Sequence, residues 1–334
     1  MANPVLVELQ RGTMIESAHR GAVAIVDADG RTVFECGDVD AAIYPRSAVK
    51  PLQALPLIET GAADRYGLAN EEIALACASH GGEPQQIAAV ERMLARVNLD
   101  VAALECGAHW PSHQASSHAL VRAGLMPTAL HNNCSGKHAG FLCAARAMGV
   151  DHRGYVAIAH PVQREVKAVI ESFTGIALSE DRCGVDGCSI PTWAVPLHKL
   201  AGAFARFGTG QSLSQIRRQA AARILEACRT KPYFIAGSGR FCTRVMELLS
   251  EAVLVKTGAE GVFCAALPER GVGIAIKCDD GSARAAEVIM AAALARSVSR
   301  PDQTALEPFW RPTLRNWNGL AIGELRPAPA LTEP

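Results

Sequence analysis

Hydrophobic and polar residues alternate along the first forty residues of the chain. The segments with strand character are 5–9, 22–26 and 32–36, and Asp27-Ala-Asp-Gly30 supplies turn residues between the last two segments. A period of two is typical of half-buried β-strands, and a short Asp/Gly turn favours a hairpin between them. The chain is therefore predicted to begin with an antiparallel hairpin or meander.

The spacing of apolar residues changes to three and four from Ser47 to about residue 250, which predicts helices. The predicted helical segments are 47–62, 84–97, 135–148, 161–174, 196–207, 213–229 and 239–250. Strand patterns then return at 252–256, 261–265, 272–277 and near 319–325, with an Ala-rich helix at 283–298 between the last two.

These strand segments lie at both ends of the chain and are joined by hairpin turns rather than by βαβ crossovers. The simplest way to close them is one antiparallel sheet built from both termini and flanked by helices. The predicted fold class is thus α/β, of the α+β kind, with a helical middle lobe. We expect one two-lobed unit over 1–334, with residues 1–46 and 250–326 in the sheet lobe and 47–249 in the helical lobe.

The composition supports a compact protein with small-molecule chemistry. Hydrophobic residues make up 49% of the chain and charged residues 20%, enough for a large core. The 33 basic and 33 acidic residues cancel, so no global charge favours binding to nucleic acid or to an anionic membrane. The eleven cysteines are scattered through apolar segments, and no uncharged apolar stretch reaches 18 residues. We therefore expect free thiols, no membrane span and a cytoplasmic location.

The segment Tyr44-Pro-Arg-Ser-Ala-Val-Lys50 contains a Ser-x-x-Lys motif at the point where strands give way to helix. Positions three apart share a helix face, so Lys50 is within reach of the Ser47 hydroxyl. A neutral lysine amine can then activate the serine as a nucleophile. One such match can also arise by chance in a chain of this length.

A Lys256-Thr-Gly258 motif follows at the start of the C-terminal strands. Penicillin-binding proteins and class A β-lactamases combine Ser-x-x-Lys at a helix start with Lys-Thr-Gly on a late strand, in this order. The two motifs together favour an acyl-serine mechanism. A clear Ser-Asp-Asn is missing, which argues against a true β-lactamase or DD-peptidase.

A second candidate nucleophile is Ser79, in the segment Ser79-His-Gly-Gly-Glu83 between two predicted helices. Paired glycines let a substrate approach backbone N–H groups closely. The alternative interpretation is a simple turn between helices. Ser79 would need its own base. Lys50 is already assigned to Ser47, so Lys256 of the Lys-Thr-Gly motif is the candidate.

Two dense polar clusters occur in the middle of the chain, His131-Asn-Asn-Cys-Ser-Gly-Lys-His138 and Gly184-Val-Asp-Gly-Cys-Ser-Ile-Pro-Thr192. Their candidate zinc ligands, judged by residue type, are Cys134, His138, Asp186 and Cys188. No Cys-x-x-Cys pair gives the spacing of a structural zinc site. The alternatives are a helix N-cap by Ser135 or Asn133, and a pair of buried structural cysteines.

Four polar motifs, namely the Tyr44–Lys50 segment, the Ser79–Glu83 segment and the two clusters, closely resemble the asparaginase II family, the rhizobial or class 3 type of L-asparaginase, over roughly residues 4–326. The resemblance implies hydrolysis of L-asparagine to L-aspartate and ammonia, a homodimer, and a fold similar to serine β-lactamases and glutaminases. It implies two Ser-Lys tandems, Ser47 with Lys50 and Ser79 with Lys256. It also implies zinc near the substrate, held by Cys134, Lys137 and Cys188.

From this resemblance we hypothesise that zinc orients the α-amino and α-carboxylate groups of the substrate rather than generating hydroxide. Further predicted substrate-binding residues are Arg46, His80, Asn133, Asp186 and Cys242, although Cys242 could serve packing alone. We expect the serine to form a β-aspartyl ester after ammonia leaves, and activity to rise above pH 7 because the lysine must be neutral.

The sequence leaves several alternatives open. Ser47 is favoured as the acylated residue, because its lysine lies one helix turn away, with Ser79 as a relay or as the nucleophile itself. Another amidohydrolase of the same fold, such as a glutaminase, fits the same motifs. A different class is a catalytically silent protein that binds zinc or an amino acid.

Overall fold

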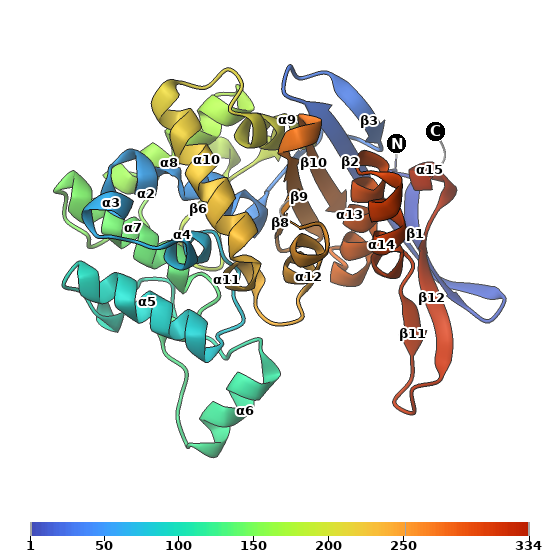
Figure 1. Ribbon diagram of the computed structural model, residues 1–334, viewed down its shortest axis with the longest axis horizontal. Coiled ribbons are helices and arrows are strands. Elements are labelled where there is room, and N and C mark those ends of the chain that lie inside the picture. Colours follow the sequence, from blue (N-terminus) through green and yellow to red (C-terminus); the bar gives the residue numbers. More distant parts are fainter. Residues whose placement is uncertain (1, 251, 333–334) are drawn as a thin grey trace. The chain divides into compact units, whose positions relative to one another are not determined.

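The computed structural model describes residues 2–250 and 252–332, and divides them between two compact units (Figure 1). We call them the sheet unit, Met1–Ala48 with Val195–Gln211 and Val255–Pro334, and the helical unit, Val49–Ala194 with Ser212–Leu254. Residues 1, 251, 333 and 334 of the expected 1–334 unit lie outside the described residues. None of the described helices is both long enough and apolar enough to span a lipid bilayer.

The main sheet has eight strands in the order β11-β12-β1-β2-β10-β9-β8, with β3 paired to β2. Its strands are β1 (Val5–Arg11), β2 (Met14–Asp27), β3 (Thr32–Cys36), β8 (Leu254–Thr257), β9 (Val262–Leu267), β10 (Val272–Cys278), β11 (Thr313–Arg315) and β12 (Ala321–Pro327). Figure 1 shows the blue β1 beside the red β12, and the two pair antiparallel. The predicted antiparallel sheet from both chain ends is confirmed.

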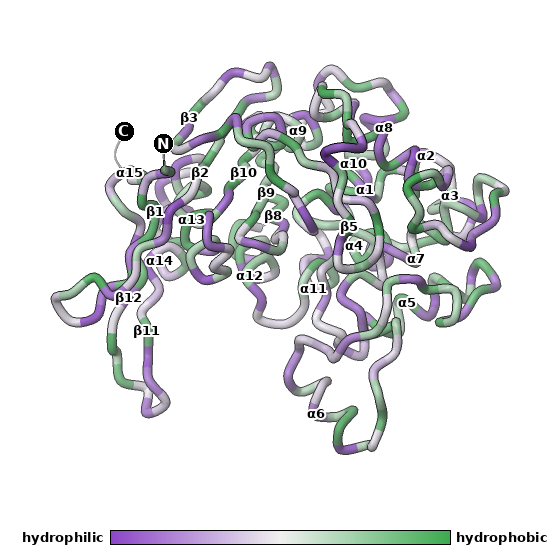
Figure 2. The backbone as a smooth tube through the Cα atoms, turned by 180° about the vertical axis from the view of Figure 1, so that it is seen from behind, coloured by the Kyte–Doolittle hydropathy of each residue, from purple (hydrophilic) through white to green (hydrophobic). Residues whose placement is uncertain are grey.

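Continuous apolar runs in the central strands form the core of the sheet unit. The run from Ala22 to Val26 in β2 is buried, as is all of β9, which Figure 2 colours as hydrophobic. Burial on both faces replaces polar alternation with unbroken apolar sequence. Helices α9 (Leu197–Thr209) and α13 (Ala283–Ser297) both pack against β10. The remaining elements of this unit are β4 (Ala42–Ile43), η1 (Arg46–Val49), β7 (Val195–Pro196), η5 (Pro268–Arg270), α14 (Arg300–Trp310) and α15 (Pro329–Thr332).

Helix α9 falls in the sheet unit, although its sequence range was expected in the helical lobe. The contact depends on Gly273 of β10, where an added Cβ would lie 2.1 Å from the carbonyl oxygen of Ala201 in α9. Only a residue without a side chain allows the helix and strand backbones to approach this closely. A hydrophobic pattern identifies the helix but not the surface that it covers.

The helical unit contains α1 (Lys50–Gln53), α2 (Leu55–Glu59), α3 (Ala62–Arg65), α4 (Asn70–Ala76), α5 (Pro84–Arg96), η2 (Val101–Ala103), α6 (Gln114–Arg122), η3 (Ala129–His131), α7 (Ser135–Met148), α8 (Pro161–Thr174), η4 (Glu180–Arg182), α10 (Gln215–Thr230), α11 (Pro232–Ala236) and α12 (Phe241–Leu248). It also holds the short hairpin of β5 (Cys183–Val185) and β6 (Pro191–Trp193). The single helix predicted over 47–62 is wrong. Pro51 and Pro56 lie in the first turns of two separate short helices, because proline lacks the N–H that a continuing helix needs.

Helix α7 lies at the centre of the helical unit, and every residue from Ser135 to Ala145 is buried. It packs against α4 and α5. The approach to α4 is close at Gly136, where an added Cβ would lie 2.3 Å from the carbonyl oxygen of Leu75. This contact holds the start of α7 against the end of α4. Lys137 lies in the first turn of α7, and Ser79 follows the end of α4.

We expect Gly136→Ala to lower the free energy of unfolding by about 2 kcal/mol or more, because the new methyl group overlaps the Leu75 backbone. Gly202→Ala in α9 is the matched control, since its Cβ would make an ordinary 3.6 Å contact with Val26. That control should be neutral or stabilising by up to about 1 kcal/mol through helix propensity. Urea unfolding of both variants measures the difference, and a Gly136→Ala protein as stable as the parent would refute the close-packing argument.

Candidate active site

Ser47 and Lys256 both belong to the sheet unit. Ser47 lies on the short 3-10 helix η1, and Lys256 lies on β8, where its side chain is fully buried and its Nζ donates to the carbonyl oxygen of Thr257 at 2.8 Å. Gly258 packs directly on the Ser47 turn, because an added Cβ would lie 2.7 Å from the Pro45 carbonyl oxygen. The Lys-Thr-Gly segment and the Ser47 turn are therefore neighbours within this unit.

Lys50 and Ser79 meet inside the helical unit. Lys50 begins α1, and its Nζ donates to Ser79 Oγ at 3.1 Å and to the carbonyl oxygen of Ala78. The Lys50 side chain is fully buried and Ser79 is 7% exposed. Sequence reasoning missed this pair, because it assigned Lys50 to Ser47 and Ser79 to Lys256. Those two assignments stay predictions.

The backbone N–H groups of the segment 79–83 all have acceptors. Ser79 and His80 donate to the carbonyl oxygens of Ile235 (2.9 Å) and Asn133 (3.2 Å). Gly81 N and Glu83 N both donate to Gln86 Oε1 at 3.1 Å, and Gly82 N donates to His80 Nδ1 at 3.1 Å. The paired glycines therefore shape a fixed turn, with Gly82 at a φ of +76°. Because these five N–H groups already have acceptors, the oxyanion of a tetrahedral intermediate would need other hydrogen-bond donors.

His80 is buried, and its protonation state follows from its neighbours. Ser135 Oγ donates its only proton to the carbonyl oxygen of Leu130 at 2.8 Å, so it must accept from His80 Nε2, also at 2.8 Å. Nδ1 then accepts from Gly82 N, which makes the ring a neutral Nε2–H tautomer. Burial, reinforced by the nearby Lys50 charge, lowers the pKa of His80 to about 3. His80 thus holds the Ser79 turn against the start of α7.

This buried neutral ring predicts a loss of stability in mild acid. The pKa of His80 rises from about 3 in the folded protein to its ordinary 6.5 on unfolding, so only the unfolded state gains the proton between these values. The stabilisation is complete above pH 6.5 and is lost as the pH falls, by about 2 kcal/mol at pH 5. In urea unfolding at pH 7 and pH 5, His80→Gln should reduce this loss. The exposed His118→Gln control should not, and equal losses in the two variants would contradict the assignment.

Cys134, Lys137 and Cys188 form a compact cluster in the helical unit. Cys134 directly precedes α7, Lys137 is in its first turn, and Cys188 comes from the loop between β5 and β6. Lys137 Nζ lies 3.0 Å from Cys188 Sγ, and Asp186 Oδ2 lies 4.0 Å from the same sulfur. All three clustered side chains are buried. The predicted zinc ligands are therefore brought together.

Cys134 and Cys188 hydrogen bond to each other, and their pKa values are shifted in opposite directions. The hydrogen bond from Cys188 and the adjacent Lys137 charge lower the pKa of Cys134 well below its usual value, while the pKa of Cys188 is raised. Burial alone would lower the pKa of Lys137, but the Cys134 thiolate raises it overall. These directions favour a thiolate at Cys134 beside the ammonium of Lys137 and the thiol of Cys188.

This donor set fits a zinc ion once protons leave it. Two thiolates are preferred zinc ligands, and a neutral lysine amine can supply a nitrogen. His138, a candidate by residue type, instead hydrogen bonds through Nδ1 to the Tyr155 hydroxyl at 2.7 Å.

The remaining predicted substrate-binding residues are distributed over both units. Arg46 precedes Ser47 with a φ of +50°, and Cys242 is buried in α12. Asn133 contributes backbone contacts, because its N–H donates to His109 Nε2 at 2.9 Å and its carbonyl accepts from His80.

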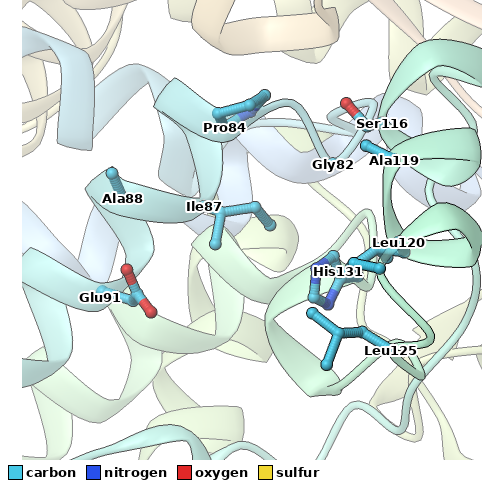
Figure 3. Close-up of a pocket in the computed structure, with 11 residues that line it drawn as sticks. Gly82, Pro84, Ile87, Ala88, Glu91, Ser116, Ala119, Leu120, Leu125 and His131 are labelled. Atoms are coloured by element: carbon cyan, nitrogen blue, oxygen red, sulfur yellow. The ribbon is translucent and has the colours of Figure 1, made fainter.

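Two further features were missed by sequence reasoning. A pocket of about 400 Å³ lies between α5 and α6, lined by side chains such as Ile87, Leu120 and Leu125 (Figure 3). Its lining is mostly apolar, which suits a zwitterionic amino acid poorly. In the sheet unit, His19, Cys278 and Asp280 bring their ligand atoms within 4.8 Å of one another and could hold a metal ion.

The comparison with protein families matches residues 7–327 to the model for L-asparaginase II. The chain belongs to the L-asparaginase II family. The match covers all four polar motifs, and it confirms the resemblance on which the ligand and tandem assignments rest. The comparison with curated proteins finds no match.

Solved structures similar to this family member include a β-lactamase from Mycobacterium bovis, with 15% identity and a TM-score of 0.40 over 80% of this chain and 89% of that one. Another is Mglu in its native form, with 16% identity and a TM-score of 0.35 over 86% of this chain and 60% of that one. Both TM-scores are below 0.5, so the fold rests on the sheet order and registers above.

Proposed function

We propose that this protein is an L-asparaginase that hydrolyses the side-chain amide of L-asparagine, giving L-aspartate and ammonia. Family membership supports the reaction. The observation that carries it is the buried hydrogen bond between Lys50 Nζ and Ser79 Oγ, because a lysine amine beside a hydroxyl in a dry environment is the arrangement of a Ser-Lys hydrolase.

In the proposed mechanism a neutral Lys50 accepts a proton through Ser79 from the attacking serine. The serine oxygen adds to the amide carbon, and the amide nitrogen takes the proton and leaves as ammonia. Water, deprotonated by the same amine, then cleaves the β-aspartyl ester and restores the serine. The prediction that Ser47 carries the ester, with Ser79 as relay, is retained. Since His80 has both ring nitrogens bonded, it positions Ser79 rather than contacting substrate.

Cys134, Lys137 and Cys188 would hold zinc. When bound, zinc would attract the α-amino and α-carboxylate groups of asparagine and fix their orientation. Lys137 and the cysteine thiols must release their protons to bind zinc, so binding should strengthen as the pH rises. Arg46, Asn133, Asp186 and Cys242 are proposed to line the substrate site. We also propose that the protein is a homodimer located in the cytoplasm.

The test is ammonia release from L-asparagine and L-glutamine by purified protein at pH 8 to 9. We expect turnover of asparagine well above that of glutamine. Turnover of glutamine alone would identify a glutaminase, and turnover of neither amide would leave a binding protein. Either result would reject the proposed reaction.

A further inference from the structure

A mixed cluster of nitrogen, sulfur and oxygen donors lies in the sheet unit and shares no residue with the set proposed for asparagine hydrolysis. His19 Nδ1 lies 2.6 Å from Asp280 Oδ2, and Cys278 Sγ lies 3.0 Å from Asp280 Oδ1. His19 is 6% exposed, Cys278 is fully buried, and the Asp280 side chain is 48% exposed. The three ligand atoms are thus close together at the edge of the core.

The secondary structure fixes the positions of all three donors. His19 is on β2 and Cys278 ends β10, and these strands pair antiparallel with Cys278 opposite Gly21. The chain turns directly after Cys278, where Asp279 N donates to the carbonyl oxygen of Arg20 at 2.9 Å. Asp280 Oδ1 also accepts from Ser282 N at 2.9 Å, which orients the carboxylate at the start of α13. Such outer hydrogen bonds are typical of groups that support metal ligands.

The buried ring of His19 is not fully satisfied. Its Nε2 atom has no hydrogen-bond partner among the described residues, although it is buried. A buried polar atom without a partner is unusual in a core and requires a reason. Among the described residues the ring is therefore held through Nδ1 alone, the atom that faces Asp280.

The geometry requires only a small expansion to accept an ion. In a tetrahedral zinc site the nitrogen and oxygen ligands lie about 3.3 Å apart, and sulfur and oxygen about 3.5 Å. Asp280 Oδ2 now lies 2.6 Å from His19 Nδ1, and Asp280 Oδ1 lies 3.0 Å from Cys278 Sγ, so the carboxylate must move outward to coordinate an ion with the other two donors. Its half-exposed side chain has room for this movement. The protons now shared with the carboxylate would be replaced by the ion.

The donor types select the metal. Thiolate, imidazole and carboxylate together suit zinc, whereas magnesium and calcium prefer oxygen ligands alone. We propose that His19, Cys278 and Asp280 form a second zinc site, with water as the fourth ligand, that links β2, the end of β10 and the turn before α13. Zinc at this site stabilises the sheet unit, because the folded chain binds it and the unfolded chain does not preorganise the ligands.

Zinc content of the dialysed full-length protein tests this site through a pair of adjacent variants. Asp280→Asn removes the ligand charge but keeps an oxygen for Ser282 N, and Asp279→Asn changes a carboxylate that bonds Asn3 instead. We expect Asp280→Asn to hold one equivalent less than Asp279→Asn. The zinc-dependent rise in Tm should also weaken in Asp280→Asn alone. Equal zinc content in the two variants would overturn the proposal.

A cobalt titration of Cys188→Ser protein separates this site from the proposed substrate zinc. Cobalt bound to a thiolate gives a near-ultraviolet charge-transfer band, and we expect one equivalent with such a band in this background. Adding Cys278→Ala should abolish the band, whereas Cys264→Ala, at another fully buried cysteine in the same sheet, should retain it. No band, or a band that survives Cys278→Ala, would overturn the site whatever the asparagine activity.

Discussion

Lys50→Met is expected to lower kcat for L-asparagine by about a thousandfold or more. Methionine fills most of the space of the buried lysine chain but cannot accept a proton, so acid–base catalysis is removed together with the hydrogen bonds to Ser79 and Ala78. Ser79→Ala should cause a loss of similar size, because the hydroxyl hydrogen bonded to Lys50 disappears. Steady-state ammonia release at pH 8.5 measures both effects. Residues that act as a unit are not additive, so the double variant should be no slower than the worse single one.

The matched controls are the exposed Lys199→Met and the α6 variant Ser116→Ala, both of which should keep parental activity. Thermal unfolding of each variant verifies that the protein remains folded. Parental kcat in a folded Lys50→Met protein would show that this lysine is not the base and would return attention to Lys256.

Cys188→Ser is expected to remove the proposed substrate zinc and to raise KM for asparagine by about ten- to a hundredfold, with a smaller change in kcat. A serine hydroxyl replaces the thiolate poorly as a zinc ligand, and substrate orientation depends on that ion in our proposal. A loss confined to KM is what removal of a uniform binding interaction produces. Zinc analysis and full kinetic curves on the same preparations connect the two effects.

Cys143→Ala is the matched control, because Cys143 is also a buried cysteine but lies deeper in α7, away from Lys137. It should keep both zinc and KM. If Cys188→Ser lost zinc without any change in kinetics, the orienting role would be rejected and the cluster would be structural.

Much of the fold could be predicted from local pattern. Strand patterns identified parts of β1, β2 and β3, and hairpin turns implied the antiparallel sheet that the strand order and register confirm. The pattern failed where a single residue determines packing. Gly273 brings α9 onto the sheet, and Pro51 and Pro56 divide the helix expected over 47–62. Hydrophobic periodicity predicts neither the packing of α9 on the sheet nor the division of this helix, because it contains no information on how closely two backbones approach.

The site was predictable as a set of motifs but not as a set of contacts. The Ser-x-x-Lys spacing pointed Lys50 toward Ser47 on an assumed α-helix, whereas the structure gives Ser47 a 3-10 turn and places Lys50 against Ser79. Twenty-nine residues separate this pair, so only the packed fold could reveal it. His19 was missed for the same reason. An isolated histidine in a strand becomes a candidate metal ligand only when β2 pairs with β10 and brings Cys278 near.

The most direct test of the acyl-serine account is hydrolysis in the presence of hydroxylamine, with L-asparagine and the β-methyl ester of L-aspartate as alternative substrates. Both should form the same β-aspartyl enzyme, so at a fixed hydroxylamine concentration the ratio of β-aspartyl hydroxamate to aspartate should be identical for the two. Different ratios, or aspartate formed from asparagine with no hydroxamate, would contradict a common β-aspartyl-serine intermediate.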